Sequence, residues 1–590
     1  MARKRINISR SKAAIAVVVT VGLVFGVRLV DLQVVNGPAL AAQSQGKRAV
    51  PVQVPALRGS IVDANGQVLA VTDERYDVQL SPKNTKVRNG IFYRGNEATT
   101  AEEAFAEIAE VIGQKPEEVK KIVDDALAED PDSDFAYVKR SVDLTTLNRL
   151  KQLGIPWLTF SSVFNRVYPN GAVAGNIIGF VGSDGAAQAG VELSQDECLT
   201  GESGVETYER SADGVQLPGS RVIEKPVRNG GQLQLTIDRD LQWELQQRTN
   251  EIRDKAQAEW VMQVLMNVKT GELVAVAEDY SVDPNNVAAS EPSHRDSRAF
   301  LLPYEPGSTY KTVTMAALLD QGQITPETQN LTPWTWNPEP NVLFRDSFAH
   351  ADTPWTATGI LERSSNVGTA MLGSRLDRET RFNYMTSFGL GRSTQAGMPF
   401  EDAGLLYPAE QWDAQTSYNV MFGQGVSSTI VQTAAIYQTI ANNGVYVPPT
   451  LIKNCTASDG EITTHDAGES HRVISEGAAQ QLQNMLENVA NADWPGKEIS
   501  IDGYRLAGKT GTAEQSDGQG GLRSDFVHSF AGYFPADNPQ YVLVTSVAFP
   551  KNGHGGVAAV GTWKQSAEAA IRHFKIEPST GSFQDIPEEY

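Results

Sequence analysis

Ser308 and Lys311 are the residues of this sequence best suited to nucleophilic chemistry. They stand in the stretch Glu305-Pro306-Gly307-Ser308-Thr309-Tyr310-Lys311, which precedes an apolar run at residues 313–319. The pattern predicts a helix that begins near Ser308 and carries Lys311 on the same face. A serine hydroxyl needs an adjacent base to act as a nucleophile. A lysine that burial or nearby positive charge keeps neutral can be that base, and backbone N–H groups at the helix start could stabilise an oxyanion.

A second motif, Ser364-Ser365-Asn366, follows downstream. Ser364 could relay a proton toward a leaving amine, and Asn366 could orient Lys311 or a substrate amide. A bare Ser-x-x-Lys also occurs at Ser9-Arg10-Ser11-Lys12, so the first motif alone is weak evidence and needs the second one.

A third motif, Lys509-Thr510-Gly511-Thr512, completes the set. Lys509 would place positive charge against a substrate carboxylate, and the two threonines would add hydroxyl groups. The glycine would let the backbone approach the acyl group closely. We therefore predict catalytic roles for Ser308, Lys311, Ser364 and Asn366, and substrate-binding roles for Lys509, Thr510, Gly511 and Thr512.

Two look-alike motifs compete with this assignment. Lys269-Thr270-Gly271 precedes the nucleophile and is typical of a hairpin turn between two strands. Ser417-Tyr418-Asn419 stands farther downstream, just before Gly423-Gln424-Gly425. The order of the three motifs along one domain-sized segment favours Ser364 and Lys509 over both alternatives.

The composition excludes several classes of protein. The chain has 590 residues, of which 41% are apolar and 21% are charged, as in a globular protein of several domains. Two cysteines exclude a disulfide scaffold, and neither they nor the seven scattered histidines have the spacing of a zinc site. The net charge of −21 argues against nucleic-acid binding. We expect no metal and no cofactor.

The N-terminus predicts a single membrane anchor. Residues 1–12 form a basic tail without acidic residues, and residues 13–30 are strongly apolar, with Arg28 as their one charged residue. Eighteen helical residues span about 27 Å, close to the bilayer core of about 30 Å. A basic flank stays on the cytosolic side, so the body of the protein should be extracellular. The alternative is a signal peptide cleaved near Ala39-Leu40-Ala41, which lies about a dozen residues beyond the apolar run.

The rest of the chain predicts two α+β domains and a tail. Residues 31–230 mix short strands with helices at residues 101–112, 116–127 and 143–153. Residues 231–575 begin with a helix at 238–255 and strands at 261–268 and 272–277, and they end with a strand at 540–549 and a helix at 563–574. Helices inserted between early and late strands of one sheet suggest an α+β domain. Residues 576–590, with four acidic residues, are predicted to be a disordered tail.

Cys198 and Cys455 fall in different predicted domains. Two free thiols are the simpler expectation. A Cys198–Cys455 bond is the alternative, because an extracellular location would permit it.

The sequence resembles the class B penicillin-binding proteins over nearly its whole length. In the first half, the resemblance rests on Arg58-Gly59-Ser60-Ile61 with Asp63 and Gly66, Arg166-Val167-Tyr168-Pro169, Gly179-Phe180-Val181, Gly190-Val191-Glu192 and Leu199-Thr200-Gly201. In the second half, it rests on the three motifs, Lys269-Thr270-Gly271-Glu272-Leu273-Val274-Ala275, Phe422-Gly423-Gln424-Gly425 and Ser529-Phe530-Ala531-Gly532-Tyr533-Phe534-Pro535. The resemblance implies a cytosolic tail (1–12), a transmembrane anchor (13–30), an elongated pedestal (31–230) and a transpeptidase domain (231–575) with a central antiparallel sheet.

The resemblance also implies a reaction. Such enzymes acylate their serine with a peptidoglycan stem peptide ending in D-Ala-D-Ala, release the last D-Ala and pass the acyl group to an amine of a neighbouring stem, and β-lactams trap the acyl-enzyme. The chain is most similar to the septal, cell-division branch, with the elongation branch as the alternative. Partners implied are a membrane glycosyltransferase and proteins of the division complex.

Two other functions compete. A β-lactamase or a D,D-carboxypeptidase would use the same motifs but would need no pedestal on a membrane anchor. A catalytically silent scaffold would have lost a motif residue, and Ser308, Lys311, Ser364, Asn366 and Lys509 are all present.

Overall fold

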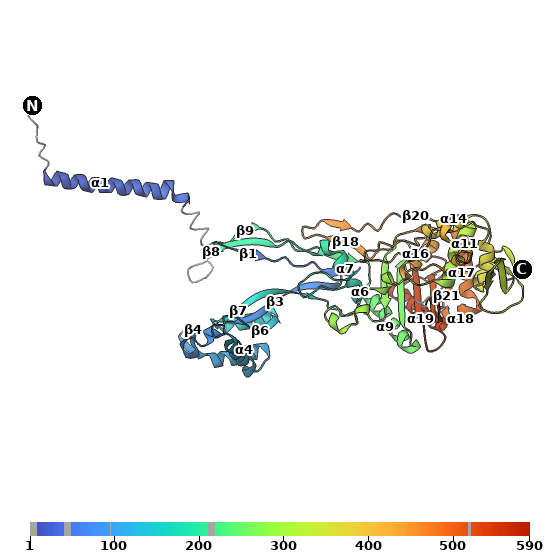
Figure 1. The fold of residues 1–590 in the computed structure, drawn as a ribbon, viewed down its shortest axis with the longest axis horizontal. Helices are drawn as coiled ribbons and strands as arrows, with labels where there is room; N and C mark the ends of the chain where they lie inside the picture. Colours follow the sequence, from blue (N-terminus) through green and yellow to red (C-terminus); the bar gives the residue numbers. More distant parts are fainter. Residues whose placement is uncertain (1–8, 40–48, 95, 210–218, 517–520) are drawn as a thin grey trace, which may run out of the picture. The chain divides into compact units, whose positions relative to one another are not determined.

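A computed structural model describes residues 9–39, 49–94, 96–209, 219–516 and 521–590 of the chain. The chain divides into two compact units, one formed by residues 1–57 and 200–230 and the other by residues 58–199 and 231–590 (Figure 1). The predicted pedestal range, 31–230, is therefore shared between the two units.

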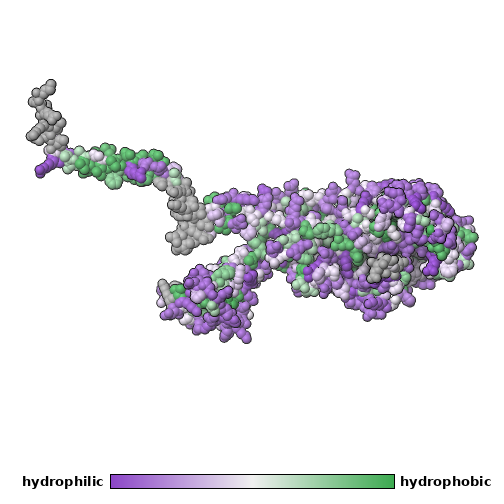
Figure 2. Space-filling view, viewed as in Figure 1, coloured by the Kyte–Doolittle hydropathy of each residue, from purple (hydrophilic) through white to green (hydrophobic). Residues whose placement is uncertain are grey.

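The smaller unit contains the apolar helix and a small sheet. Helix α1 (Arg10–Val30), continued by a π-helical turn to Val35, has no buried residue and is long and apolar enough to cross a membrane. In Figure 2 it is mostly green, with purple hydrophilic residues near its two ends. The sheet is antiparallel, in the order β1 (Ala49–Val54), β8 (Gly204–Glu209) and β9 (Val222–Lys225). Part of the alternative cleavage site, Leu40-Ala41, lies outside the described residues.

The larger unit contains two main sheets. The first has the order β19-β18-β10-β2-β3-β6, with β7 also pairing with β3. The bounds of its strands are β2 (Ile61–Val62), β3 (Val68–Leu80), β6 (Ala136–Val142), β7 (Leu158–Val167), β10 (Gln232–Leu235), β18 (Ile452–Thr456) and β19 (Ile462–Thr464). Because β10 pairs with both β2 and β18, this sheet joins the predicted pedestal to the predicted catalytic domain.

Three predicted helices pack beside this sheet. They are α3 (Ala101–Ile112), α4 (Pro116–Glu129) and α5 (Leu144–Gln152). Local signals fix them: Thr100 caps α3 in a capping box with Glu103, and Gly113 ends it at a φ of 68°. Their apolar faces form one core with β3, β6 and β7.

Three motifs of the first half meet in one buried ion cluster. The carboxylate of Glu192 is fully buried and accepts from Arg58 Nε at 2.6 Å and from Arg166 Nε at 2.7 Å. Tyr168 Oη donates to the same carboxylate at 3.2 Å. A buried carboxylate needs such partners. These motif residues therefore link the segment before β2, the end of β7 and helix α7 (Gly190–Ser194).

The second sheet is fully antiparallel, in the order β12-β11-β23-β22-β21. Its strands are β11 (Trp260–Asn267), β12 (Leu273–Glu278), β21 (Ala507–Ser516), β22 (Leu522–Phe534) and β23 (Tyr541–Ala548). This confirms the predicted central antiparallel sheet and the strands expected at 261–268, 272–277 and 540–549.

Helices cover both faces of this sheet. Phe530 and Phe534 pack with α9 (Arg239–Ala256) and α19 (Gly555–Phe574) on one face. The alternate residues Ala531 and Tyr533 pack with α11 (Lys311–Asp320) and α16 (Ile430–Ala441) on the other. Helix α17 (Glu476–Asn491) packs beside β21 and α11. Helix α19 begins eight residues before the predicted start at Trp563, because the glycine-rich stretch after His554 is helical here.

The remaining elements are short. The helices are α6 (Gly175–Ile178), α7 (Gly190–Ser194), α8 (Asp196–Leu199), α10 (Arg298–Leu301), α12 (Ala357–Glu362), α13 (Asn366–Gly373), α14 (Arg378–Ser387), α15 (Ala414–Asn419) and α18 (Asp493–Ile499). The strand pairs are β4 (Ile91–Arg94) with β5 (Glu97–Thr100), β13 (Gln329–Thr332) with β16 (Thr353–Thr356), β14 (Thr335–Glu339) with β15 (Val342–Arg345), and β17 (Val445–Tyr446) with β20 (His471–Arg472).

Two sequence expectations are wrong. Cys198 and Cys455 form a disulfide rather than two free thiols. They can pair because β10 lies beside both β18, which carries Cys455, and α8, which carries Cys198. Gly231 N–H, just before β10, donates to the Cys198 carbonyl at 2.7 Å.

The 576–590 segment is not a disordered tail. Ile576 and Ile586 are buried, and Thr356 N–H donates to the carbonyl of Glu588 at 2.9 Å. The prediction rested on the acidic composition of the segment. The buried isoleucines and the backbone hydrogen bond nevertheless attach it to the domain.

Candidate active site

Ser308 and Lys311 lie where a 3-10 turn runs into a helix. The 3-10 turn covers Gly307–Tyr310 and α11 begins at Lys311, so helical structure begins near Ser308 as predicted, but its first turn is 3-10 rather than α-helical. Because α11 is buried on nearly all sides, the Lys311 side chain is fully removed from solvent. Ser308 is only partly buried. The candidate nucleophile is thus accessible while its candidate base is desolvated.

Lys311 contacts the second motif directly. Its Nζ donates to the carbonyl oxygen of Ser364 and, at 3.2 Å, to Ser364 Oγ. Ser364 has a φ of 57°, in the left-handed region that non-glycine residues seldom occupy. Such a conformation persists only where the surroundings enforce it, and it is common at active sites.

The pKa of Lys311 is lowered well below its ordinary value. Burial is the largest cause, the positive charge of Lys509 adds to it, and the carboxylate of Asp346 opposes it. A lowered pKa increases the fraction of neutral amine that can accept the Ser308 proton. Burial and nearby positive charge, either of which could keep a lysine base neutral, are both present.

Ser365 and Asp346 anchor the second motif. Ser365 caps α13: its Oγ accepts from Gly368 N–H at 2.8 Å and donates to Asp346 Oδ2 at 2.6 Å. Asp346 Oδ1 accepts from Val367 N–H at 2.9 Å. Asp346 is buried, and sequence reasoning missed it because no spacing in the sequence connects it to the motif.

Asn366 is the first residue of α13 and is half-buried. In the described part of the chain it makes no hydrogen bond to Lys311. Its predicted orienting role therefore stays a prediction.

Lys509 brings the third motif to the same place. It lies in β21, is fully buried, and donates from Nζ to the carbonyl oxygen and to Oγ1 of Thr510, both at 3.2 Å. Burial lowers the pKa of Lys509 to about 7. Lys509 is near enough for its charge to depress the pKa of Lys311, so all three motifs converge.

Strand β21 packs closely against the loop that carries Ser308. A Cβ at Gly511 would lie 2.3 Å from Ser529 Oγ and 3.0 Å from the Pro306 carbonyl oxygen, so packing already requires a glycine there. Thr512 is exposed, and its Oγ1 lies 3.4 Å from His528 Nδ1. Contacts with Ser529 and Pro306 therefore fix the backbone at Gly511, while the Thr512 hydroxyl is exposed and accessible to a ligand.

Gly423 holds the same loop from the other side. Gly307 N–H donates to the Gly423 carbonyl at 3.0 Å, and a Cβ at Gly423 would lie 2.2 Å from the Gly307 carbonyl oxygen. Both glycines have positive φ, 58° and 80°. This contact explains why Phe422-Gly423-Gln424-Gly425 belongs with the Ser308 motif.

Glu305 is a second residue that sequence reasoning did not single out. Its carboxylate accepts from Gly425 N–H at 3.0 Å, and its backbone pairs with the Gln515 side chain through two hydrogen bonds of 3.1 Å. Burial, with a further contribution from Glu514, raises the pKa of Glu305 to about 7. Glu305 therefore ties the Ser308 loop to both β21 and the glycine loop.

The look-alike motifs have structural roles elsewhere. Lys269-Thr270-Gly271 is the turn between β11 and β12, as predicted, and Lys269 Nζ donates to Asn442 Oδ1 at 3.0 Å. Ser417 is buried, and its Oγ and carbonyl oxygen accept from Arg381 at 3.2 and 2.6 Å. Both observations agree with the choice of Ser364 and Lys509.

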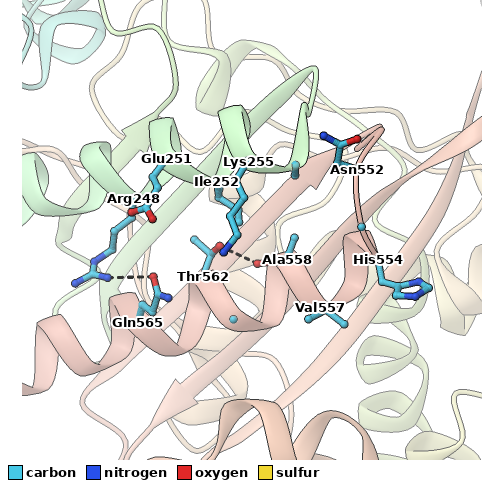
Figure 3. Close-up of a pocket in the computed structure, with 13 residues that line it drawn as sticks. Arg248, Glu251, Ile252, Lys255, Asn552, His554, Val557, Ala558, Thr562 and Gln565 are labelled. Atoms are coloured by element: carbon cyan, nitrogen blue, oxygen red, sulfur yellow. Dashed lines mark hydrogen bonds between the residues drawn. The ribbon is translucent and has the colours of Figure 1, made fainter.

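A cavity of about 400 Å³ lies away from these motifs. It is formed by the C-terminal half of α9, the first half of α19 and the loop before α19, with Arg248, Lys255 and His554 in its wall (Figure 3). Since α9 and α19 cover the face of the sheet opposite α11, the cavity does not belong to the Ser308 site.

Comparison with known proteins identifies the family. The model of the penicillin binding protein transpeptidase domain matches residues 261–565, which contain all three motifs, and the model of the penicillin-binding protein dimerisation domain matches residues 53–235. The chain belongs to the class B penicillin-binding proteins. The resemblance inferred from the motifs is confirmed, as is the two-domain fold.

Individual members of this family match most of the chain. Penicillin-binding protein PbpB of Mycolicibacterium smegmatis is 34% identical over 559 residues, covering 91% of this chain and 86% of PbpB. Peptidoglycan D,D-transpeptidase FtsI of Escherichia coli is 28% identical, covering 93% of this chain and 89% of FtsI. The structure of penicillin binding protein 3 from Mycobacterium tuberculosis complexed with ampicillin matches with a TM-score of 0.69 at 28% identity, covering 91% of this chain and all of that one.

Proposed function

We propose that this protein is a peptidoglycan cross-linking D,D-transpeptidase that acts through an acyl-enzyme on Ser308. The observation that carries the proposal is the contact between the buried amine of Lys311 and Ser364. Lys311 follows Ser308 by one helical turn and is close enough to Lys509 to feel its charge. Family membership and the name of the Escherichia coli relative support it.

The residues divide the reaction between them. Ser308 Oγ attacks the carbonyl carbon of the penultimate D-Ala and gives its proton to the neutral amine of Lys311. The C–N bond breaks, and Ser364 passes the proton from Lys311 to the leaving D-Ala amine. The amine of a second stem peptide then attacks the acyl-enzyme, which releases the cross-linked product and restores Ser308. Lys509, Thr510 and Thr512 bind the terminal carboxylate of the first substrate.

The same chemistry would suit a β-lactamase or a D,D-carboxypeptidase, and the lifetime of the penicilloyl-enzyme separates a β-lactamase from the proposed transpeptidase. A transpeptidase keeps the adduct for hours, whereas a β-lactamase hydrolyses it in milliseconds. Incubating the full-length protein in detergent with penicillin and following the intact mass gives the lifetime. Rapid turnover of penicillin would refute the transpeptidase. Release of D-Ala with transfer to an added amine distinguishes it from a carboxypeptidase.

A catalytically silent scaffold remains the alternative from another class. The five residues whose loss would mark it are all present, and the buried state of Lys311 costs stability without serving a scaffold. Absence of any adduct with fluorescent penicillin would favour the scaffold.

The proposed location is the cell membrane, with residues 1–12 in the cytosol, α1 as the anchor and residues 31–590 outside. The basic tail before an apolar helix supports this orientation. Protease added to spheroplasts should degrade residues 31–590 and leave the anchor with its cytosolic tail. A protected body of the protein would reverse the orientation.

The proposed role is septal cell-wall synthesis during division, with a membrane glycosyltransferase and division-complex proteins as partners. The match to PbpB and FtsI supports this branch over the elongation branch. A fluorescent fusion should gather at the division site of growing cells, and an even distribution along the side wall would point to elongation.

A further inference from the structure

The 584–590 segment contacts both ends of the short helix that leads into Ser364. We propose that this segment is a strap that positions Ser364 for the reaction, and that Glu588 is its positioning residue. The inference rests on the proposed function, since it takes Ser364 as a participant in proton transfer.

The strap grips the start of α12. Thr356, the N-cap of this helix, donates from N–H to the Glu588 carbonyl at 2.9 Å and from Oγ1 to the Pro587 carbonyl at 2.8 Å. Tyr590 N–H donates to the Pro354 carbonyl at 3.0 Å, and Glu589 forms a β-bridge with Trp355. The strap thus adds a strand-like partner to β16 directly before α12.

The strap also grips the end of α12. The guanidinium of Arg363, which follows the helix and precedes Ser364, donates from Nε and Nη2 to the two carboxylate oxygens of Glu588, the second at 2.6 Å. A two-point pair of this kind fixes orientation as well as distance. One residue, Glu588, therefore contacts the helix through its backbone at one end and through its side chain at the other.

The strap and the helix are packed so closely that no side chain fits between them at residue 359. A Cβ at Gly359, in the first turn of α12, would lie 2.2 Å from the Glu588 carbonyl oxygen. The helix can approach the strap this closely only because residue 359 is a glycine.

The strap is itself anchored on α17. Ile586 is buried, its N–H donates to Asn488 Oδ1 at 2.9 Å, and Asn488 Nδ2 donates to the Gln584 carbonyl at 2.8 Å. Helix α17 packs beside both β21 and α11. The strap therefore connects α12 to the elements that carry Lys509 and Lys311.

This connection matters because α12 sets the conformation of Ser364. Ser364 N–H donates to the Leu361 carbonyl at 3.2 Å and Ser365 N–H to the Ile360 carbonyl at 3.0 Å, so the last turn of the helix holds the strained φ of Ser364. A shift of the helix would move Ser364 Oγ away from Lys311 Nζ, and proton transfer is sensitive to displacements of this order.

Acylation kinetics of the full-length protein in detergent test the strap. Stopped-flow with a fluorescent penicillin separates non-covalent binding from the rate constant of acylation. Glu588→Gln should lower the acylation rate constant about two- to five-fold, the size expected for a partly exposed ion pair, with little change in binding. Glu589→Gln removes the same charge from the neighbouring exposed side chain and should leave both constants unchanged. Deleting residues 584–590 should cost about tenfold or more.

Exchange of the charges supplies the rescue. Arg363→Glu should be slow alone, and Arg363→Glu combined with Glu588→Arg should recover part of the lost rate. Acylation of Glu588→Gln and of the deletion variant at the parent rate would overturn the strap, as would a loss in binding alone. If the deletion variant does not fold, Glu588→Gln decides. An unacylated parent protein would instead overturn the proposed function.

Discussion

Two buried lysines lie in the candidate active site. Lys311 and Lys509 are both fully buried, and burial lowers the pKa of both. Burying a lysine amine without a paired carboxylate is costly for folding, so two such lysines in one place indicate a functional demand. The lysines share the site but have different partners: Lys311 Nζ donates to Ser364, whereas Lys509 Nζ donates to Thr510 on the edge strand β21.

Lys509→Ala should slow acylation by penicillin about ten- to a hundred-fold, because a charge-assisted hydrogen bond to the substrate carboxylate contributes about 1.5–3 kcal/mol. Lys269→Ala is the matched control, because it changes the same residue type in the other Lys-Thr-Gly and should leave acylation almost unchanged. Stopped-flow acylation measures both. A damaging Lys269→Ala with a silent Lys509→Ala would mean that the third motif is assigned to the wrong place.

The pH dependence of protein stability should show the effect of the lowered pKa of Lys509. Its pKa is about 7 in the folded state against an ordinary 10.5, so the unfolded chain binds more protons between about pH 7 and pH 10.5. The contribution of Lys509 to the free energy of unfolding therefore becomes more favourable to the folded state as pH rises through this window. Lys509→Met should raise the free energy of unfolding at pH 7 by about 1 kcal/mol or more, and this advantage should shrink by pH 9. Denaturant unfolding at both pH values is the measurement, and equal advantages at the two would contradict it.

The site residues that the sequence could predict are those with fixed motif spacing. Ser308, Lys311, Ser364 and Lys509 could be assigned because residue type, order and local helix signals agreed. Asp346 and Glu305 could not, since their partners, Ser365 and Gly425, lie far away in the sequence. Such contacts depend on the packing of the chain and leave no local pattern.

At the scale of elements, three segments hold the Ser308 loop: β21, α11 and the glycine loop at residues 422–425. The contact of Gly307 with Gly423 is the tightest, with 2.2 Å between a Cβ at Gly423 and the Gly307 carbonyl oxygen. The position of Ser308, the candidate nucleophile, therefore depends on a close backbone approach that admits no side chain.

Gly423→Ala should lower the free energy of unfolding by about 2 kcal/mol or more and acylation about tenfold or more, because a positive φ and a backbone clash combine. Gly561→Ala, in the middle of α19, is the control: nothing lies within 4 Å of its Cβ. It should raise stability by about 0.5–1 kcal/mol. Thermal unfolding and acylation assays measure both, and a neutral Gly423→Ala would show that the loop contact is not needed.

Element boundaries were predictable where caps are local. Helix α3 begins and ends as predicted because each end has a local cap. Thr100 and Glu103 form the capping box at its start, and Gly113 ends it. The start of α19 and the order of 576–590 were not, because packing against β22 and α17 there outweighs glycine content and acidic charge.

At the scale of the whole molecule, the first sheet joins segments that are far apart in the sequence. β10 pairs with β2 on one side and β18 on the other, and the disulfide links two cysteines separated by 257 residues. The sequence analysis predicted neither β10 nor β18, and no local pattern shows which strands pair, which is why free thiols were the simpler expectation.

Replacing both cysteines, Cys198→Ser with Cys455→Ser, should lower the free energy of unfolding by about 2–5 kcal/mol, because the bond closes a long loop in the unfolded chain. Acylation of the folded protein should change little, since the bond lies in the first sheet and Ser308 beside the second. Unfolding under oxidising conditions measures the loss. A double variant as stable as the parent would mean that the bond does not form.

The central claim is that Ser308 is the acylated nucleophile of a transpeptidase. The most direct measurement is intact-mass and peptide mapping of the penicillin adduct in the parent protein and in Ser308→Ala, which removes one oxygen and should preserve the fold. We predict one adduct per parent chain, located on the peptide that contains Ser308, and none in Ser308→Ala. An adduct that persists in Ser308→Ala, or that maps to Ser417 or another residue, would contradict the account.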